Sequence, residues 1–165
     1  MKQKINQIIT ILFLTFLATS CNKISPAVFW TKFHKDLITV NISDQGPWGG
    51  HRELKWKAEP KKTFTEVELI KFSKINNWEL IDSITFSADI MTSKSLSNLK
   101  NDDYSLSIIK DKIIPKLSLK DNKIFIFKTT WLAVEAGNAR ETFENGFAIL
   151  NSDKTELKIY HLWGE

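Results

Sequence analysis

KIFIFKTTWLAV, residues 123–134, carries the clearest fold signal in the chain. Its apolar side chains occupy successive positions from Ile124 to Phe127, so both faces of an extended segment here are apolar. A strand that is apolar on both faces is typical of the interior of a sheet rather than its edge. We therefore expect residues 123–134 to form a central strand.

The segments after this strand alternate between turn and strand signals. Ala136-Gly137-Asn138 predicts a turn, and residues 140–150 return as a strand in which Asn145-Gly146 marks a bulge or a second tight turn. Residues 151–154 turn the chain again, and residues 156–163 form the last strand. Consecutive strands joined by short turns predict an antiparallel C-terminal meander.

Upstream of the meander, one segment has the signals of a helix. Thr65 and Glu68 have the spacing of a capping box, and Asn76-Asn77 predicts a left-handed stop. Between them, apolar residues recur at close to helical spacing. This stripe comprises Val67, Leu69, Ile70, Phe72 and Ile75.

Strand signals lie on both sides of the helix. Residues 36–42 are rich in β-branched side chains and predict the first strand, which the glycine- and proline-rich residues 44–50 end. Residues 51–57 alternate, with Arg52, Leu54 and Trp56 on one face and polar residues on the other, and residues 78–86 alternate similarly.

The stretch between residues 86 and 123 decides the fold class. Residues 87–103 are polar and predict a loop, whereas residues 104–114 favour a second helix that ends before Pro115. These elements predict an α+β fold, with an antiparallel sheet and one or two helices packed on one face. If residues 104–114 are a strand instead, a β-sandwich or small barrel is the alternative.

The N-terminus has the organisation of an export signal. Lys2 and Lys4 precede an apolar run from Ile8 to Leu17, and small residues then lead to Cys21. The run is about half of the roughly 20 residues that a permanent transmembrane helix needs. The alternatives are an ordinary secretory signal and a buried helix.

Leu17-Ala18-Thr19-Ser20-Cys21 resembles the lipobox of bacterial lipoproteins, although Ala18 stands where Leu, Val or Ile is usual. The resemblance implies that signal peptidase II removes residues 1–20 and that the new N-terminal Cys21 carries acyl chains such as palmitate. Residues 21–27 would then be a lipidated tether and residues 28–165 a single globular domain. Because Asn22 rather than Asp follows the cysteine, the resemblance implies the periplasmic face of the outer membrane.

Composition excludes several classes of function. Cys21 is the only cysteine, so a lipid on it leaves neither a disulfide nor a thiol nucleophile. The formal net charge is only +4 and the basic residues are scattered, which argues against a nucleic-acid partner. The chain has no nucleophile elbow, phosphate-binding glycine loop, zinc-protease helix or calcium loop, so no cofactor is predicted.

Residues 48–53 are the best candidate for a ligand or partner site. The segment comprises Trp48, Gly49, Gly50, His51, Arg52 and Glu53. Paired glycines allow close approach of a backbone to a ligand, the indole offers a flat binding face, and the last three residues supply a base, a fork of donors and a carboxylate. The alternative is a tight hairpin whose Trp48 caps the core.

Other polar residues extend the candidate site. His161 is the best third partner for a metal site with His51 and Glu53, but it alternates with apolar residues and is expected to be a neutral core histidine, so no metal site is predicted. Arg140 and Glu144 would share a strand face and form an ion pair or a polar groove. A solvated sheet edge is the simpler interpretation of this pair.

Two classes of function fit these observations. The first is a membrane-anchored, non-enzymatic module that binds a protein partner or small ligand, such as an inhibitor, an immunity-type protein or an assembly accessory. The second is a small hydrolase or lyase that uses His51, Glu53 or His161 as acid and base and Arg52 to hold an anionic substrate. A carrier of a small apolar ligand is a further alternative.

Overall fold

A computed structural model of the 165-residue chain describes residues 25–86, 103–117 and 122–165. The predicted signal peptide, Cys21 and nearly all of the predicted polar loop, residues 87–102, lie outside the described residues. Within the described part of the chain, no helix is long and apolar enough to cross a membrane.

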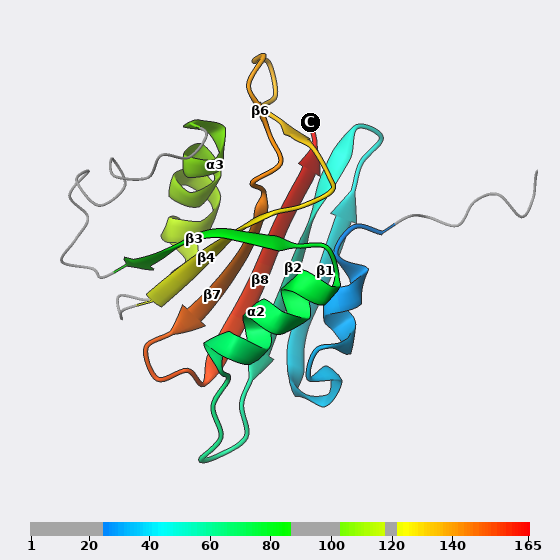
Figure 1. Ribbon diagram of the computed structural model, residues 1–165. Coiled ribbons are helices and arrows are strands. Elements are labelled where there is room, and N and C mark those ends of the chain that lie inside the picture. The colour runs from blue at the N-terminus through cyan, green and yellow to red at the C-terminus, as the bar shows by residue number, and fades with distance from the viewer. Residues whose placement is uncertain (1–24, 87–102, 118–121) are drawn as a thin grey trace, which may run out of the picture.

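An eight-stranded sheet organises the fold (Figure 1). Its main path runs β1-β2-β8-β7-β4-β3, and these neighbours are all antiparallel, as predicted. The small strands β5 and β6 pair with each other beside the end of β8. The strands are β1 (Ile38–Gln45), β2 (Gly49–Lys57), β3 (Glu79–Phe86), β4 (Asn122–Lys128), β5 (Ala133–Val134), β6 (Glu141–Thr142), β7 (Gly146–Asn151) and β8 (Glu156–Gly164).

The strand predicted from residues 123–134 is an internal strand. β4 pairs with β3 on one side and β7 on the other, and Ile124 to Phe127 are all buried. The strand is shorter than predicted, because it ends at Lys128 and the chain bends before β5. The residues that are apolar on both faces therefore mark an internal strand, although β4 lies next to the edge strand β3 and not at the centre of the sheet.

The predicted meander is present, with one break. The return strand over residues 140–150 is divided into β6 and β7, and Asn145 lies in the break. The buried Asn145 side chain donates to the Trp131 carbonyl at 2.7 Å and accepts from the Thr129 hydroxyl at 2.7 Å. After β7, Asn151 Oδ1 accepts hydrogen bonds from two backbone N–H groups and fixes the turn into β8.

Both predicted helices are present. Helix α2 (Glu66–Ile75) begins where the Thr65 hydroxyl accepts from the Glu68 N–H at 3.2 Å, and Asn77 has a left-handed φ of 62°. Helix α3 (Asp103–Ile108) continues through a π-helical turn, η4 (Ile109–Ile113), and a 3₁₀ turn, η5 (Ile114–Lys116). Pro115 lies in the 3₁₀ turn, so α-helical bonding ends before it, as predicted.

Two further 3₁₀ turns precede the sheet. These are η1 (Val28–Lys32) and η2 (Lys35–Leu37). The first strand therefore begins at Ile38 rather than at Asp36 as predicted, because the chain is still helical at Asp36.

The two α-helices pack on opposite faces of the sheet. We call the side with α2, η1 and the side chains of Arg52, Leu54 and Trp56 the aromatic face, because three buried tryptophans gather there. The opposite side, with α3 and the side chains of Glu53 and Lys55, we call the lysine face. The second helix thus does not share a face with the first.

Packing of α2 differs from the predicted stripe at both ends. Leu69 is buried, and Ile70 and Phe72 pack against the aromatic core, but Val67 and Ile75 are exposed. The stripe is narrower than predicted because α2 lies across the front of β8 and β2 and turns only one side toward the sheet (Figure 1).

Candidate functional site

Trp48 lies at the turn between β1 and β2 and does not cap the core. Its side chain is 79% exposed, which excludes the core-capping interpretation of this tryptophan. The hairpin is closed by the Gly46 N–H, which donates to the Gly49 carbonyl at 2.7 Å. An exposed indole at a hairpin tip is available for contact with a partner.

The adjacent glycines have a structural reason. A Cβ atom on Gly49 would lie 2.3 Å from the Trp163 carbonyl oxygen, and one on Gly50 would lie 2.1 Å from the Asp44 carbonyl oxygen. Gly164 in β8 has a φ of +70°, and a Cβ atom there would lie 2.0 Å from the Trp48 carbonyl oxygen. The glycines therefore let three strands approach one another, which accounts for the Gly-Gly pair without a ligand.

Arg52 is buried on the aromatic face and fastens the start of the domain to the sheet. Its Nε donates to the Pro26 carbonyl at 3.0 Å, Nη1 donates to Asn41 Oδ1 at 3.3 Å, and Nη2 donates to the Ser25 hydroxyl. A planar guanidinium can serve three acceptors at once, which a lysine ammonium cannot do with the same geometry. The role of Arg52 seen here is structural.

His161 stands directly opposite Arg52 in the β2–β8 ladder and is completely buried. Burial, together with the positive charge of Arg52, lowers the pKa of His161 to about 3. Its ring packs against Trp78 and Trp163, with Nε2 3.4 Å from the Thr129 hydroxyl. The prediction of a neutral core histidine is confirmed.

His51 lies on the lysine face, where its ring stacks on Tyr160 with centroids 5.8 Å apart. The sheet thus separates His51 and Glu53 from Arg52 and His161. The constellation required by the hydrolase hypothesis does not form, because its groups cannot reach one substrate through the sheet. Among the described residues, no group of three His, Cys, Asp or Glu side chains is placed to hold a metal ion.

Arg140 pairs with Glu135, whereas the predicted partner was Glu144. Two parallel hydrogen bonds join them, from Nε to Oε2 at 2.6 Å and from Nη2 to Oε1 at 2.7 Å. The turn over residues 136–139 brings Glu135 back to Arg140, whose carbonyl accepts from the Glu135 N–H. β6 contains only residues 141–142, so the strand face that Arg140 and Glu144 were predicted to share is not formed.

Three lysines converge on Glu53, and sequence reasoning did not identify this cluster. The buried carboxylate lies 3.1 Å from the Nζ of Lys55, 3.4 Å from that of Lys158 and 3.6 Å from that of Lys116. Burial alone would raise the pKa of Glu53, but the three ammonium groups outweigh it and hold that pKa below its ordinary value. We call these four residues the lysine cluster.

The sheet register explains how the cluster forms. Lys55 in β2 pairs directly with Lys158 in β8, and Glu53 is two residues along β2 on the same face. Lys116 enters from η5, where α3 ends over the sheet. Burial lowers the pKa of Lys158, and the charge of Glu53 opposes that effect.

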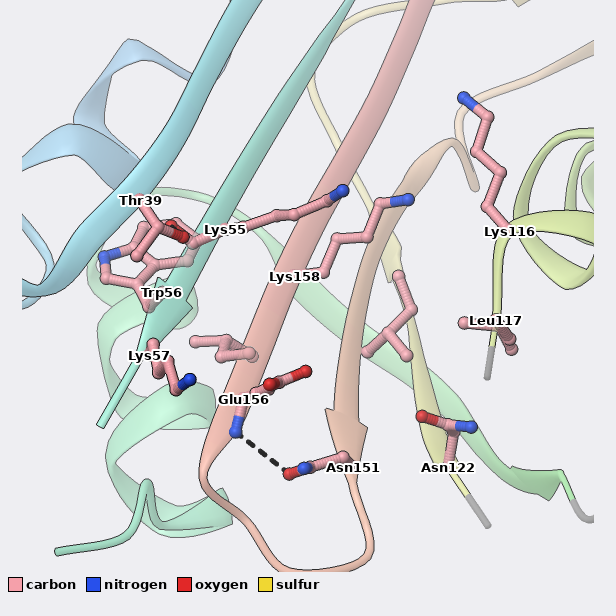
Figure 2. Close-up of a pocket in the computed structure, with 12 residues that line it drawn as sticks. Thr39, Lys55, Trp56, Lys57, Lys116, Leu117, Asn122, Asn151, Glu156 and Lys158 are labelled. Carbon is pink, nitrogen blue, oxygen red and sulfur yellow. Dashed lines mark hydrogen bonds between the residues drawn. The ribbon is translucent and has the colours of Figure 1, made fainter. Parts of the chain in front are cut away.

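A pocket of about 320 Å³ opens beside the lysine cluster. In Figure 2, Lys55 and Lys158 extend side by side above it, Lys116 stands on its far side, and Glu156 and Asn151 lie below. Its lining residues are Thr39, Lys55, Trp56, Lys57, Lys116, Leu117, Asn122, Ile149, Asn151, Glu156, Leu157 and Lys158.

Comparison with known proteins adds no assignment to this geometry. No protein-family model, no curated protein and no solved structure matches the chain.

Proposed function

We propose that the chain is a bacterial lipoprotein, held on a membrane by a lipid on Cys21, whose domain is a non-enzymatic binding module. The observation that carries the binding role is the lysine cluster beside an open pocket on one face of the sheet. The resemblance to a lipobox supports the lipid anchor, and Asn22 favours the periplasmic face of an outer membrane.

The clamp made by Arg52 supports the anchored arrangement. Arg52 holds Ser25 and Pro26 on the sheet, so the folded domain begins four residues after Cys21. Four residues span at most about 14 Å when fully extended. A lipid on Cys21 would therefore keep the domain close to the membrane surface.

The chemistry of the lysine cluster favours binding over catalysis. Glu53 is its carboxylate, but a carboxylate whose pKa is lowered by three ammonium groups is a weak general base. The other candidate base, His161, is fully buried on the aromatic face and so does not reach the pocket. Lysine-lined walls also make the pocket a poor fit for the alternative of an apolar-ligand carrier.

Trp48 supports a second contact, with a protein partner. Its exposed indole projects from the hairpin tip at the end of the sheet. Large exposed aromatic side chains are enriched at protein interfaces. This contact is separate from the pocket, since Trp48 does not line it.

Expression of the full chain in a bacterium that processes lipoproteins tests the anchor. Wild type should incorporate labelled palmitate and sediment with the outer membrane, whereas Cys21→Ser should incorporate none and retain its signal segment. Ser20→Ala, which keeps a small residue before the cysteine, is the matched control and should behave as wild type. Palmitate incorporation by Cys21→Ser, or an unmodified Cys21 thiol in wild type, would contradict the proposal.

A further inference from the structure

Positive charge exceeds negative charge at the pocket on the lysine face. Four lysines line it, namely Lys55, Lys57, Lys116 and Lys158. The carboxylates beside them are Glu156 in the lining and Glu53 in the lysine cluster. The site therefore has two more positive than negative side chains, at a concave surface.

We propose that this pocket binds a phosphate group, with Lys55, Lys116 and Lys158 as the binding residues. The inference rests on the proposed binding role and specifies the ligand chemistry of that site. Glu53 then orients the three ammonium groups and does not itself contact the ligand.

Hydrogen-bonding capacity supports a phosphate. Each ammonium has three N–H donors. Glu53 lies within hydrogen-bond distance of Lys55 and Lys158, at 3.1 and 3.4 Å, and forms a looser ion pair with Lys116 at 3.6 Å. The remaining donors of the three lysines have to be satisfied by water or by an anion. A phosphate offers several strong acceptor oxygens and negative charge, so it can accept from more than one lysine at once.

The electrostatic cost of placing these lysines together also favours a bound anion. Lys55 and Lys158 are directly opposite each other, and like charges in this position destabilise a sheet. The Lys158 side chain is only 11% exposed, so its charge is also largely removed from water. Glu53 neutralises one of three positive charges, and a bound anion would neutralise the remainder.

The pocket has room for more than the phosphate itself. Its volume of about 320 Å³ is at the lower end of the range for small-molecule sites. Leu117 and Ile149 line it together with the lysines, so an apolar group attached to the phosphate would find an apolar wall. A soluble phosphate ester and a phospholipid headgroup share this chemistry.

Calorimetric titration of the mature lipoprotein in a non-ionic detergent tests the assignment. The probes are inorganic phosphate and pyrophosphate at low ionic strength, and the variants are Lys55→Gln and Lys116→Gln. Lys71→Gln removes the same charge from an exposed position of α2 and is the matched control. Circular dichroism and thermal melting establish that each variant is folded.

The variants should change affinity in opposite directions. Lys55→Gln and Lys116→Gln should each weaken pyrophosphate binding about fivefold, as expected for loss of one partly exposed charge contact. Glu53→Gln should strengthen it severalfold, because the negative charge that competes with the ligand is removed while an amide oxygen remains to accept from the lysines. A purely structural role for the cluster predicts no binding in any of these proteins.

A second titration, with phosphatidic acid in the same micelles, distinguishes a phospholipid headgroup from a soluble phosphate ester. Displacement of pyrophosphate by phosphatidic acid, but not by phosphatidylcholine, would assign a lipid headgroup, and no displacement would assign a soluble ester. Absence of binding to every phosphate probe, or equal weakening by Lys71→Gln, would overturn the site. That failure would leave palmitate labelling of Cys21 unaffected, so it is distinguishable from failure of the anchor.

Discussion

The two faces of the sheet are built from the same strands but differ in what they do with charge. On the aromatic face, Arg52 is buried with three acceptors and His161 is neutral, so polar groups there are paired or uncharged within a covered core. On the lysine face, three ammonium groups share the single carboxylate of Glu53 beside an open pocket. Charge on the first face is satisfied internally, and on the second face it is left in excess.

The difference lies between neighbouring residues of β2. Arg52 and Glu53 point to opposite faces because successive side chains in a strand alternate. A helix and two 3₁₀ turns cover the aromatic face. On the lysine face, α3, η4 and η5 pack over residues of β3, β4, β7 and β8, and the apolar cluster they form there includes no residue of β1 or β2 (Figure 1). Ligand binding is therefore expected on the lysine face, and variants on the aromatic face should change stability first.

Removal of a buried aromatic side chain from the aromatic face should have the largest effect on stability. Trp30 is fully buried among Phe33, Trp56 and Trp78, so Trp30→Ala should lower the free energy of unfolding by about 4 kcal/mol. Trp48→Ala, at the exposed hairpin tip, should change it by less than about 0.5 kcal/mol. Urea unfolding measures both, and similar losses would contradict the assignment of the core.

Removing the buried arginine should have the next largest effect. Arg52→Met leaves the Pro26 carbonyl and Ser25 without their donor, and it should cost about 2–3 kcal/mol of unfolding free energy. Lys57→Met, at an exposed position of the same strand on the other face, should cost less than about 0.5 kcal/mol. Faster proteolytic cleavage near Ser25 in Arg52→Met alone would identify the clamp, and equal cleavage in the two variants would argue against it.

His161 should give the aromatic face a pH dependence of smaller size. Its pKa of about 3 in the folded protein is below its ordinary value, so between these values the unfolded chain binds a proton that the folded protein does not. The contribution of His161 to the free energy of unfolding is therefore fully present above its ordinary pKa, and it is lost as the pH is lowered. Between about pH 7.5 and about pH 5 the loss should be about 2 kcal/mol.

The matched comparison for this pH dependence is His161→Gln. Chemical denaturation of the variant should show a flatter stability profile over the same range, whatever its absolute stability. An unchanged slope would mean that another group, and not His161, titrates there.

Local signals predicted most of the fold. The capping box at Thr65, the turn at residues 151–154 and the apolar residues of β4 act over a few positions. The helix start and the turn formed where expected, and β4 formed as an internal strand but ended at Lys128. The face on which α3 packs was not predictable, because it depends on tertiary packing and not on the helix's own pattern.

The functional groups were less predictable than the strands that carry them. Alternation placed Arg52 and Glu53 on opposite faces, but the acceptors of Arg52 come from residues 25–26, far away in the sequence. The contact of Glu53 with Lys116 depends on where η5 ends over the sheet. Arg140 pairs with Glu135 and not with Glu144, because the turn between residues 135 and 140, and not strand alternation, determines which carboxylate lies beside it.

Lysine-specific chemical labelling, followed by mass spectrometry, tests the contrast between the faces most directly. With saturating pyrophosphate, we predict lower labelling of Lys55 and Lys116 on the lysine face and unchanged labelling of Lys71 on α2, which covers the aromatic face. Uniform loss of labelling at all three lysines, or no change at Lys55 and Lys116, would contradict the account.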